Sequence, residues 1–207
     1  MQDKIQEFIA QAHRVGDAGL TLCSSGNLSW KIGDNKVLVS GTGSWVPTLK
    51  AEQVAICDLT TGESLNGVKP SMESTFHLGV MRERPDVNVV LHFQSPYATQ
   101  IACSTVRPKS YNVTAEIPLH VGREIPEIPF LRPGSPELAQ AVKEALKEHN
   151  SAMLLSHGQV VCGKDFDDVF QRATFFEMAC QICVRANMEP AVLDEETVTN
   201  LINFFLK

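Results

Sequence analysis

Apolar residues recur at helical spacing in three segments of the chain. The first segment predicts an amphipathic helix that weakens at Gly16 and Gly19, and its apolar positions are Ile5, Phe8, Ile9, Ala12 and Val15. A second stripe follows Ser135-Pro136, a pair typical of a helix start. The third runs from Asp165 to about Ala186. These segments predict the helices that cover the core.

Short runs rich in β-branched residues predict a sheet between those helices. Val87–Phe93 is the densest run and has the composition of a buried strand. The other predicted strands are Leu28–Lys31, Lys36–Ser40, Val54–Leu59, Ala152–Ser156 and Gln159–Cys162. The turn Gly33-Asp34-Asn35 joins the first two. Segment Tyr111–Phe130 contains three prolines and predicts an irregular region with short strands.

Three further helices are predicted from their end signals. One begins at Ser71, as N-cap, and ends near Arg84 before Pro85. Another follows Ser95-Pro96 and reaches about Cys103, and a short one ends at Lys207. Helices and strands mix without strict alternation, repeat or linker, so we expect one layered α/β domain over residues 1–207.

Composition narrows the class of protein. The net charge of -6 and the lack of a Lys/Arg-rich run argue against a nucleic-acid binder. No apolar run is long enough to span a membrane, and the N-terminal residues do not form a secretory signal. We expect a cytoplasmic protein whose scattered cysteines are free and buried among apolar neighbours, namely Cys23, Cys57, Cys103, Cys162, Cys180 and Cys183.

Two histidines at predicted strand ends form the first candidate for chemistry. His92 and Gln94 are two residues apart and would share one face of a strand, and His157 follows another strand. Neutral imidazoles are good zinc ligands, whereas an amide oxygen is a poorer one. Two histidines that only form hydrogen bonds at strand ends are the plain alternative.

The remaining candidates are a helix start and two loops of small residues. Glu73 in the first turn of the helix at Ser71 could act as a general base, or could simply complement the helix dipole. Loops Ser24–Asn27 and Ser40–Ser44 could let backbone amides approach a phosphate, or could be ordinary turns. The pattern at Gly41-Thr42-Gly43 is neither a Walker loop nor a dinucleotide fingerprint.

Three other features carry weaker signals. His77 lies four residues after Glu73 on the same helix face, which favours a packing role or one that supports a ligand. His120 is a possible extra ligand. Cys180 and Cys183 match C-x-x-C but fall in an apolar helical stripe, which favours core residues.

In their order along the chain, these motifs resemble the class II aldolase/adducin family. The resemblance runs from about Ile5 to Phe205 and rests on Ser25–Ser29, Gly41–Gly43, Lys69–Glu73, Arg84–Asn88, His92-x-Gln94 and Ser156–Gly158. It implies a three-layer α/β/α sandwich around a mixed, largely antiparallel sheet. It also implies a homotetramer with active sites at subunit contacts.

The resemblance also implies a divalent metal, usually zinc, held by three histidines. His92 and His157 match the first and third of these positions, and Gln94 stands at the second. An amide oxygen of Gln94 could ligate, or His120 could supply the missing imidazole. Glu73 matches the residue that moves the proton.

The residues of the family's phosphate pocket and its proton donor are matched only in part by this sequence. The matching phosphate-binding positions are Asn27, Thr42, Gly43 and Ser71. Met72 stands where a second serine is common, so that contact is lost or passes to Ser74. A tyrosine serves as proton donor in part of the family, and here Tyr111 and Glu116 are candidates, while gap-free matching reaches Ala115.

The implied activity is metal-dependent cleavage of a ketose 1-phosphate through an enediolate. L-fuculose 1-phosphate is the first expected substrate, with dihydroxyacetone phosphate and L-lactaldehyde as products. An L-ribulose-5-phosphate 4-epimerase type of reaction is the alternative within the fold. The alternative without enzymatic activity is an adducin-like interaction module, and Gln94 is the feature that favours it.

Overall fold

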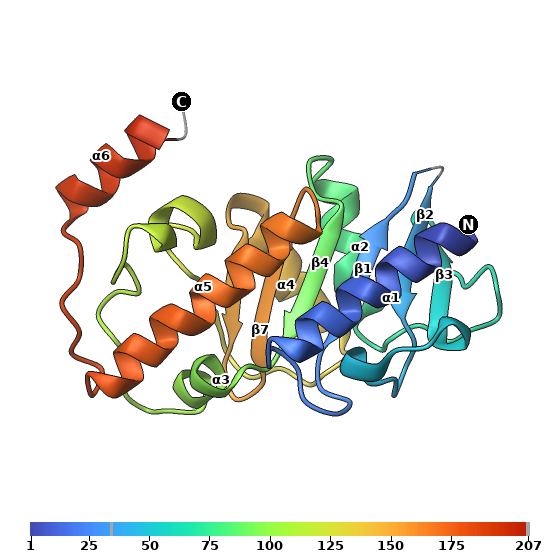
Figure 1. Ribbon diagram of the computed structural model, residues 1–207, viewed down its shortest axis with the longest axis horizontal. Coiled ribbons are helices and arrows are strands. Elements are labelled where there is room, and N and C mark those ends of the chain that lie inside the picture. The colour runs from blue at the N-terminus through green and yellow to red at the C-terminus, as the bar shows by residue number, and fades with distance from the viewer. Residues whose placement is uncertain (34, 206–207) are drawn as a thin grey trace.

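The computed structural model describes residues 1–33 and 35–205, in which seven strands form one sheet (Figure 1). Their order is β3-β2-β1-β4-β7-β6-β5, and only β5 and β6 pair in parallel. The strands are β1 (Asn27–Lys31), β2 (Lys36–Ser40), β3 (Val54–Asp58), β4 (Val89–Phe93), β5 (Glu127–Ile128), β6 (Ser151–Leu154) and β7 (Gly158–Gly163). The expected mixed, largely antiparallel sheet is confirmed.

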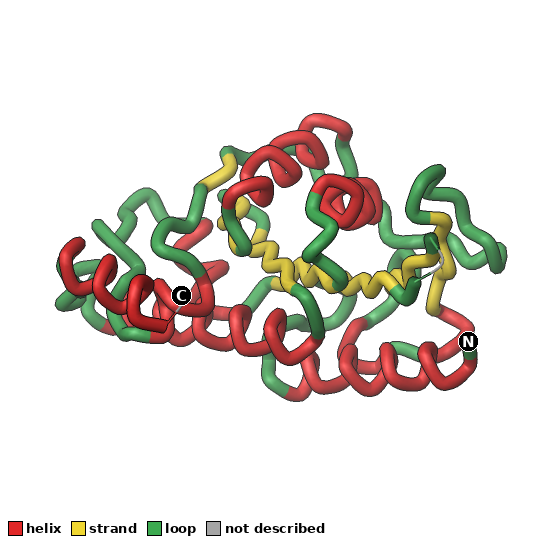
Figure 2. The backbone as a smooth tube through the Cα atoms, turned by 90° about the horizontal axis from the view of Figure 1, so that it is seen from above, coloured by secondary structure: helices red, strands yellow, loops and turns green. Residues whose placement is uncertain are grey.

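Helices cover both faces of this sheet and complete the three expected layers (Figure 2). The helices are α1 (Gln2–Asp17), α2 (Ser74–Glu83), α3 (Pro96–Ala102), α4 (Pro136–Glu148), α5 (Phe166–Arg185) and α6 (Glu195–Phe205). One apolar core joins α1, α3 and α5 to the sheet, and a second core joins α2 and α4 to the opposite face. The sheet is therefore buried on both sides, which explains its dense runs of valine and leucine.

The register of the central strands sets His92 beside Asn27 on the α2 side of the sheet. In β4, Leu91 and Phe93 belong to the core under α5, whereas Val90 belongs to the core under α2. Side chains two residues apart share a face, so His92 points to the α2 side with Val90. Asn27 is the partner of His92 in the antiparallel β1–β4 ladder, and directly paired residues share a face.

The start of α2 differs from the sequence prediction. The helix begins at Ser74 rather than at Ser71, so Ser71 is not its N-cap. The reason is a long-range contact, because the Ser71 N–H donates to the Ser40 carbonyl and Pro70 bridges to Gly41. These bonds hold the preceding segment extended beside the end of β2. As a result, Ser71 lies next to the loop that contains Thr42.

Segment Tyr111–Phe130 contains more helix than expected. It holds a five-residue π-helix, Ile117–Val121, which the prolines concealed, and the short strand β5. Two further sequence predictions extend beyond the described residues. The turn Gly33-Asp34-Asn35 includes residue 34, and the C-terminal helix is described only as far as Phe205.

Four of the six cysteines are buried as expected, and two are not. Cys57, Cys162, Cys180 and Cys183 lie in the core, and burial raises the pKa of their thiols. Cys23 and Cys103 are exposed, which corrects the prediction. Cys103 forms the end of α3, and Cys23 lies in the loop before β1. Apolar neighbours in the sequence therefore do not ensure that a cysteine is buried when it lies at the end of a helix or in a loop.

None of the helices in the described part of the chain is long and apolar enough to cross a membrane.

Candidate active site

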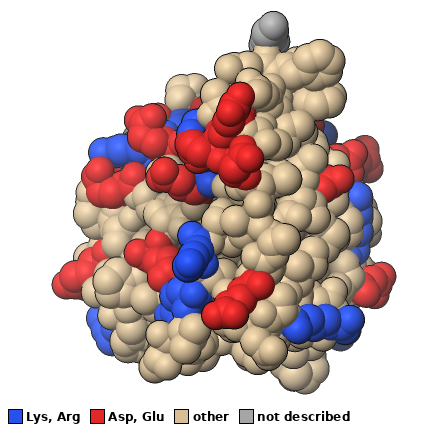
Figure 3. Space-filling model, turned by 90° about the vertical axis from the view of Figure 1, so that its left-hand side faces the viewer, with Lys and Arg blue, Asp and Glu red and all other residues tan. Residues whose placement is uncertain are grey.

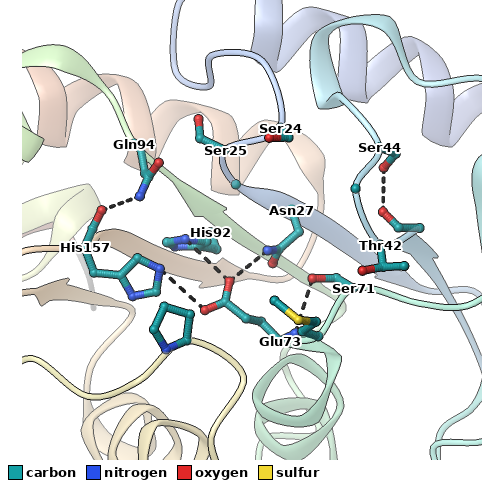
Figure 4. Close-up of a pocket in the computed structure, with 15 residues that line it drawn as sticks. Ser24, Ser25, Asn27, Thr42, Ser44, Ser71, Glu73, His92, Gln94 and His157 are labelled. Atoms are coloured by element: carbon teal, nitrogen blue, oxygen red, sulfur yellow. Dashed lines mark hydrogen bonds and ion pairs between the residues drawn. The ribbon is translucent and has the colours of Figure 1, made fainter.

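All eight predicted site residues line one cavity of about 220 Å³ (Figure 4). They come from the start of β1, the loop after β2, the segment before α2, the end of β4 and the turn between β6 and β7. These residues are Asn27, Thr42, Gly43, Ser71, Glu73, His92, Gln94 and His157. Long-range pairing therefore brings together side chains that are up to 130 residues apart in the chain.

Glu73, His92 and His157 form the centre of the cavity. Glu73 Oε2 lies 3.5 Å from His92 Nε2, and Glu73 Oε1 lies 3.5 Å from His157 Nε2. Mainly because of burial, the pKa of His157 falls to about 4, so this imidazole is neutral near pH 7. The three side chains offer atoms that could bind a metal ion, and these atoms lie within 4.8 Å of one another. They are the His, Cys, Asp and Glu side chains that converge in this way within residues 1–33 and 35–205.

The hydrogen bonds around this centre leave donor atoms that suit a metal ion. His92 Nδ1 lies 2.9 Å from the Gln159 carbonyl oxygen, which can only accept, so in the neutral ring it is Nε2 that presents a lone pair to Glu73. Glu73 Oε1 is buried without a hydrogen-bond partner among the described residues. Buried lone pairs that face one another repel, and a divalent cation would satisfy them. An imidazole anchored on a carbonyl through its other nitrogen is also the common arrangement at metal sites.

Gln94 and His120, the two candidates for a third imidazole position, lie in different places. Gln94 lines the cavity, and its Nε2 donates to the His157 carbonyl oxygen (Figure 4). His120 belongs to the π-helix and packs against Phe175, with ring centroids 5.4 Å apart. It lines a separate hollow with Arg14 and Lys164. Within this chain, His120 therefore does not reach the centre of the cavity.

The loop after β2, which contains Thr42, and Ser71 before α2 lie across the cavity from Gln94 (Figure 4). The Thr42 N–H donates to the Lys69 carbonyl, which ties the loop after β2 to the segment before α2. Ser71 Oγ accepts from the Glu73 N–H at 3.3 Å, so its own proton is available to a ligand. Gly43 has a φ of +71°, a conformation that glycine adopts without strain.

Gly26 allows β1 to approach the end of β4. Its φ is +79°, and a Cβ atom there would lie 2.6 Å from the His92 carbonyl oxygen. Only glycine fits this approach without moving either strand. The glycine of the Ser-Gly-Asn motif therefore sets the distance between Asn27 and His92.

A buried polar network on α2 and β1 was not recognised in the sequence. His77 contacts both Asn27 and Ser29, and Asn27 Nδ2 donates to Glu73 Oε2 at 2.9 Å. All four of these side chains are buried. Spacing gave a partial signal, because His77 follows Glu73 by four residues on a helix and Ser29 follows Asn27 by two on a strand.

The proposed proton donors Tyr111 and Glu116 lie outside the cavity. The Tyr111 hydroxyl donates to Glu127, and its ring packs against Phe176. Burial raises the pKa of Tyr111 well above the ordinary value of a tyrosine. Glu116 precedes the π-helix and does not line the cavity either.

Hydroxyl, amide and imidazole groups line the cavity, and the described lining residues include no lysine or arginine. An anionic ligand would therefore be held by N–H and O–H donors and by a bound cation. This arrangement agrees with the acidic net charge of the chain. An acidic chain of this kind binds an anionic ligand through local donors in one cavity and not through a broad positive surface.

Comparison with known proteins places this geometry in context. A family model described as "Class II Aldolase and Adducin N-terminal domain" matches residues 6–184. A 3-oxo-tetronate 4-phosphate decarboxylase of Haemophilus influenzae is 34% identical over 73% of this chain and 73% of its own length. An L-fuculose phosphate aldolase of Methanococcus maripaludis is 31% identical over 86% of this chain and 94% of its own.

A solved structure shares nearly the whole fold. YgbL from Klebsiella pneumoniae superposes with a TM-score of 0.88 at 28% identity, covering 97% of this chain and 98% of that one. The cavity therefore lies within a known structural framework.

Proposed function

Because this chain belongs to the class II aldolase and adducin family, whose enzyme members are metal-dependent lyases, we propose that it cleaves a carbon–carbon bond beside the carbonyl of a phosphorylated substrate. The observation that carries the proposal is the convergence of Glu73, His92 and His157 beside the Thr42 and Ser71 loops. The proposed metal is divalent, with zinc as the first candidate. When bound, it would act as a Lewis acid that polarises the carbonyl and stabilises the developing negative charge.

The chain's own residues have separate proposed tasks. The hydroxyls of Thr42 and Ser71, with the backbone at Gly43, hold the phosphate and orient the substrate. Asn27 has one amide hydrogen on Glu73 and a second that can reach the phosphate end. Glu73 takes up a proton from solvent water and delivers it to the carbon that loses its substituent, which returns Glu73 to the carboxylate form.

Two substrates suggested by the relatives lead to the same product. Loss of CO₂ from 3-oxo-tetronate 4-phosphate leaves the bonding electron pair on C2, conjugated with the C3 carbonyl, as an enediolate. Cleavage between C3 and C4 of L-fuculose 1-phosphate releases L-lactaldehyde and leaves the same enediolate. One proton on carbon then yields dihydroxyacetone phosphate in both cases, so one phosphate pocket and one acid serve both reactions.

We propose the decarboxylation as the first candidate. Aldol cleavage requires removal of a hydroxyl proton as the aldehyde departs, whereas CO₂ departs without one. Besides the metal-site group, the described cavity lining has no titratable side chain to take that proton. Cleavage of L-fuculose 1-phosphate is the second candidate, supported by the aldolase relative that covers more of the chain.

The test is a comparison of the two substrates with the metal-loaded protein. We expect CO₂ release from 3-oxo-tetronate 4-phosphate, with a kcat/KM at least tenfold above that for aldehyde release from L-fuculose 1-phosphate, about 1.4 kcal/mol in transition-state binding. Dihydroxyacetone phosphate in D₂O should also exchange a carbon-bound hydrogen, as followed by NMR. The reverse preference would make the chain an aldolase, and absence of both cleavage and exchange would favour the non-catalytic, adducin-like alternative.

Gln94 is proposed as a further metal ligand through its amide oxygen, because Nε2 is already held by the His157 carbonyl. Replacing Gln94 with methionine, which has similar length, should weaken metal binding by roughly 10- to 100-fold. Gln94→His should strengthen it, since imidazole is the better zinc ligand. Competition with a chromogenic chelator measures both, and equal affinity in all three proteins would leave Gln94 only as an anchor for His157.

We also propose that the protein forms a homotetramer and is located in the cytoplasm. Helix α6 exposes Phe204 and Phe205, and with Leu201 they line a shallow hollow. Figure 3 views this side of the molecule and shows a broad area without charged side chains beside a group of acidic ones. Exposed apolar surface of this kind supports association.

A further inference from the structure

His77 lies at the centre of a buried chain of hydrogen bonds that ends on Glu73. Its Nδ1 is 2.7 Å from Ser29 Oγ, and its Nε2 is 2.5 Å from Asn27 Oδ1. The His77 side chain is fully buried, and burial lowers its pKa to about 3. A neutral imidazole has one N–H and one acceptor nitrogen, so the two contacts must have opposite roles.

The carboxylate of Glu73 determines the direction of this chain. Asn27 Nδ2 donates to Glu73 Oε2 at 2.9 Å, because the opposite amide orientation would set two oxygens against each other. Asn27 Oδ1 therefore faces His77 and can only accept. His77 Nε2 must then carry the proton, and Nδ1 accepts from the Ser29 hydroxyl.

The backbone spacing makes this arrangement rigid. Ser29 and Asn27 are two residues apart on β1 and share its α2 face. Glu73 and His77 are four residues apart, at the start and in the first turns of α2. Two strand positions thus face two helix positions, and each donor in the chain points toward Glu73.

We infer that His77 is a positioning residue, which acts through Asn27 to hold Glu73 in the orientation for proton transfer. This inference rests on the proposed function of Glu73. By fixing the Asn27 amide, His77 keeps a donor on Oε2 and leaves Oε1, which has no hydrogen-bond partner within the described residues, for proton transfer. His77 does not line the cavity and reaches it only through Asn27.

The decisive experiment compares His77→Gln with His77→Asn. Glutamine places an amide N–H near the position of Nε2, whereas asparagine is too short to reach Asn27. We expect His77→Asn to lower kcat by roughly 100-fold, the cost of a misplaced catalytic group, with a smaller rise in KM from the loss of the Asn27 contact to the phosphate. His77→Gln should retain kcat within about tenfold of the wild-type value, the cost of losing part of one hydrogen bond. Equal losses of kcat in both variants, or a rise in KM as large as the fall in kcat, would overturn the inference.

A double-mutant cycle tests whether His77 acts through Asn27. With Asn27→Ala already present, His77→Asn should reduce kcat no further, because the connecting amide is gone. Additive losses would contradict the inference. If His77→Asn does not fold, Ser29→Ala tests the other end of the chain and should lower kcat by a smaller factor at unchanged KM.

One readout is independent of turnover. A high-resolution crystal structure or ¹⁵N NMR of the side-chain amide should show Asn27 held on Glu73 in the wild type and released in His77→Asn. If the wild type has no activity, the proposed function fails while this readout still decides the positioning role. An Asn27 amide that is unchanged in His77→Asn would refute that role.

Discussion

Replacing Glu73 with glutamine is expected to lower kcat by roughly 1,000-fold, within the range for loss of a general acid or base. Glu73 is the carboxylate at the centre of the cavity, with Oε1 and Oε2 each 3.5 Å from a histidine nitrogen. Glutamine preserves its size but cannot transfer a proton. Turnover of the preferred substrate and hydrogen exchange into dihydroxyacetone phosphate should fall together.

The controls for this variant separate proton transfer from metal binding. His92 and His157 remain in Glu73→Gln, so the metal should still be present by elemental analysis, although one donor is weaker. Glu73→Asp retains the carboxylate at a shorter reach and should lie between wild type and Glu73→Gln. Unchanged turnover in Glu73→Gln would exclude Glu73 as the acid.

Removing the metal should abolish activity, and adding back a divalent ion should restore it. The negative charge that stays on the enediolate has no cationic side chain near it in the described cavity lining, so a bound cation is the expected stabiliser. The measurement is metal content per chain, with turnover before chelation, after chelation and after reloading. We expect one metal ion per chain in protein that has never met a chelator.

Histidine variants provide the matched comparison. His92→Ala and His157→Ala should lose both metal and activity, since each supplies a donor atom to the buried group. His120→Ala should keep both, because His120 lies against Phe175 in another part of the molecule. Full activity in thoroughly chelated protein, or metal loss in His120→Ala, would contradict the assignment.

Much of the secondary structure could be predicted from local pattern. The predicted strand Lys36–Ser40 is exact, and the long helix predicted from Asp165 to about Ala186 spans Phe166–Arg185. These elements have strong periodicity and clear end signals. The start of α2 was wrong because the bond between Ser71 and the Ser40 carbonyl overrides the local capping signal.

The sequence indicated which residues belong to the candidate site better than it indicated the contacts between them. Motif resemblance identified Glu73, His92 and His157, and they converge as expected. The network through Ser29 and His77 was not predicted, since it depends on the strand register and on how α2 packs against β1. No local pattern specifies that register.

The sequence by itself determined most of the elements, the family and the motif residues that could carry chemistry, because hydrophobic period and short motifs are local properties. Only the tertiary structure decided which of these side chains meet. Asn27 faces His92 through the β1–β4 register, and Glu73 reaches them because Pro70 and Ser71 are tied to the end of β2. These contacts join residues that are tens of positions apart, so their geometry depends on long-range hydrogen bonds and packing.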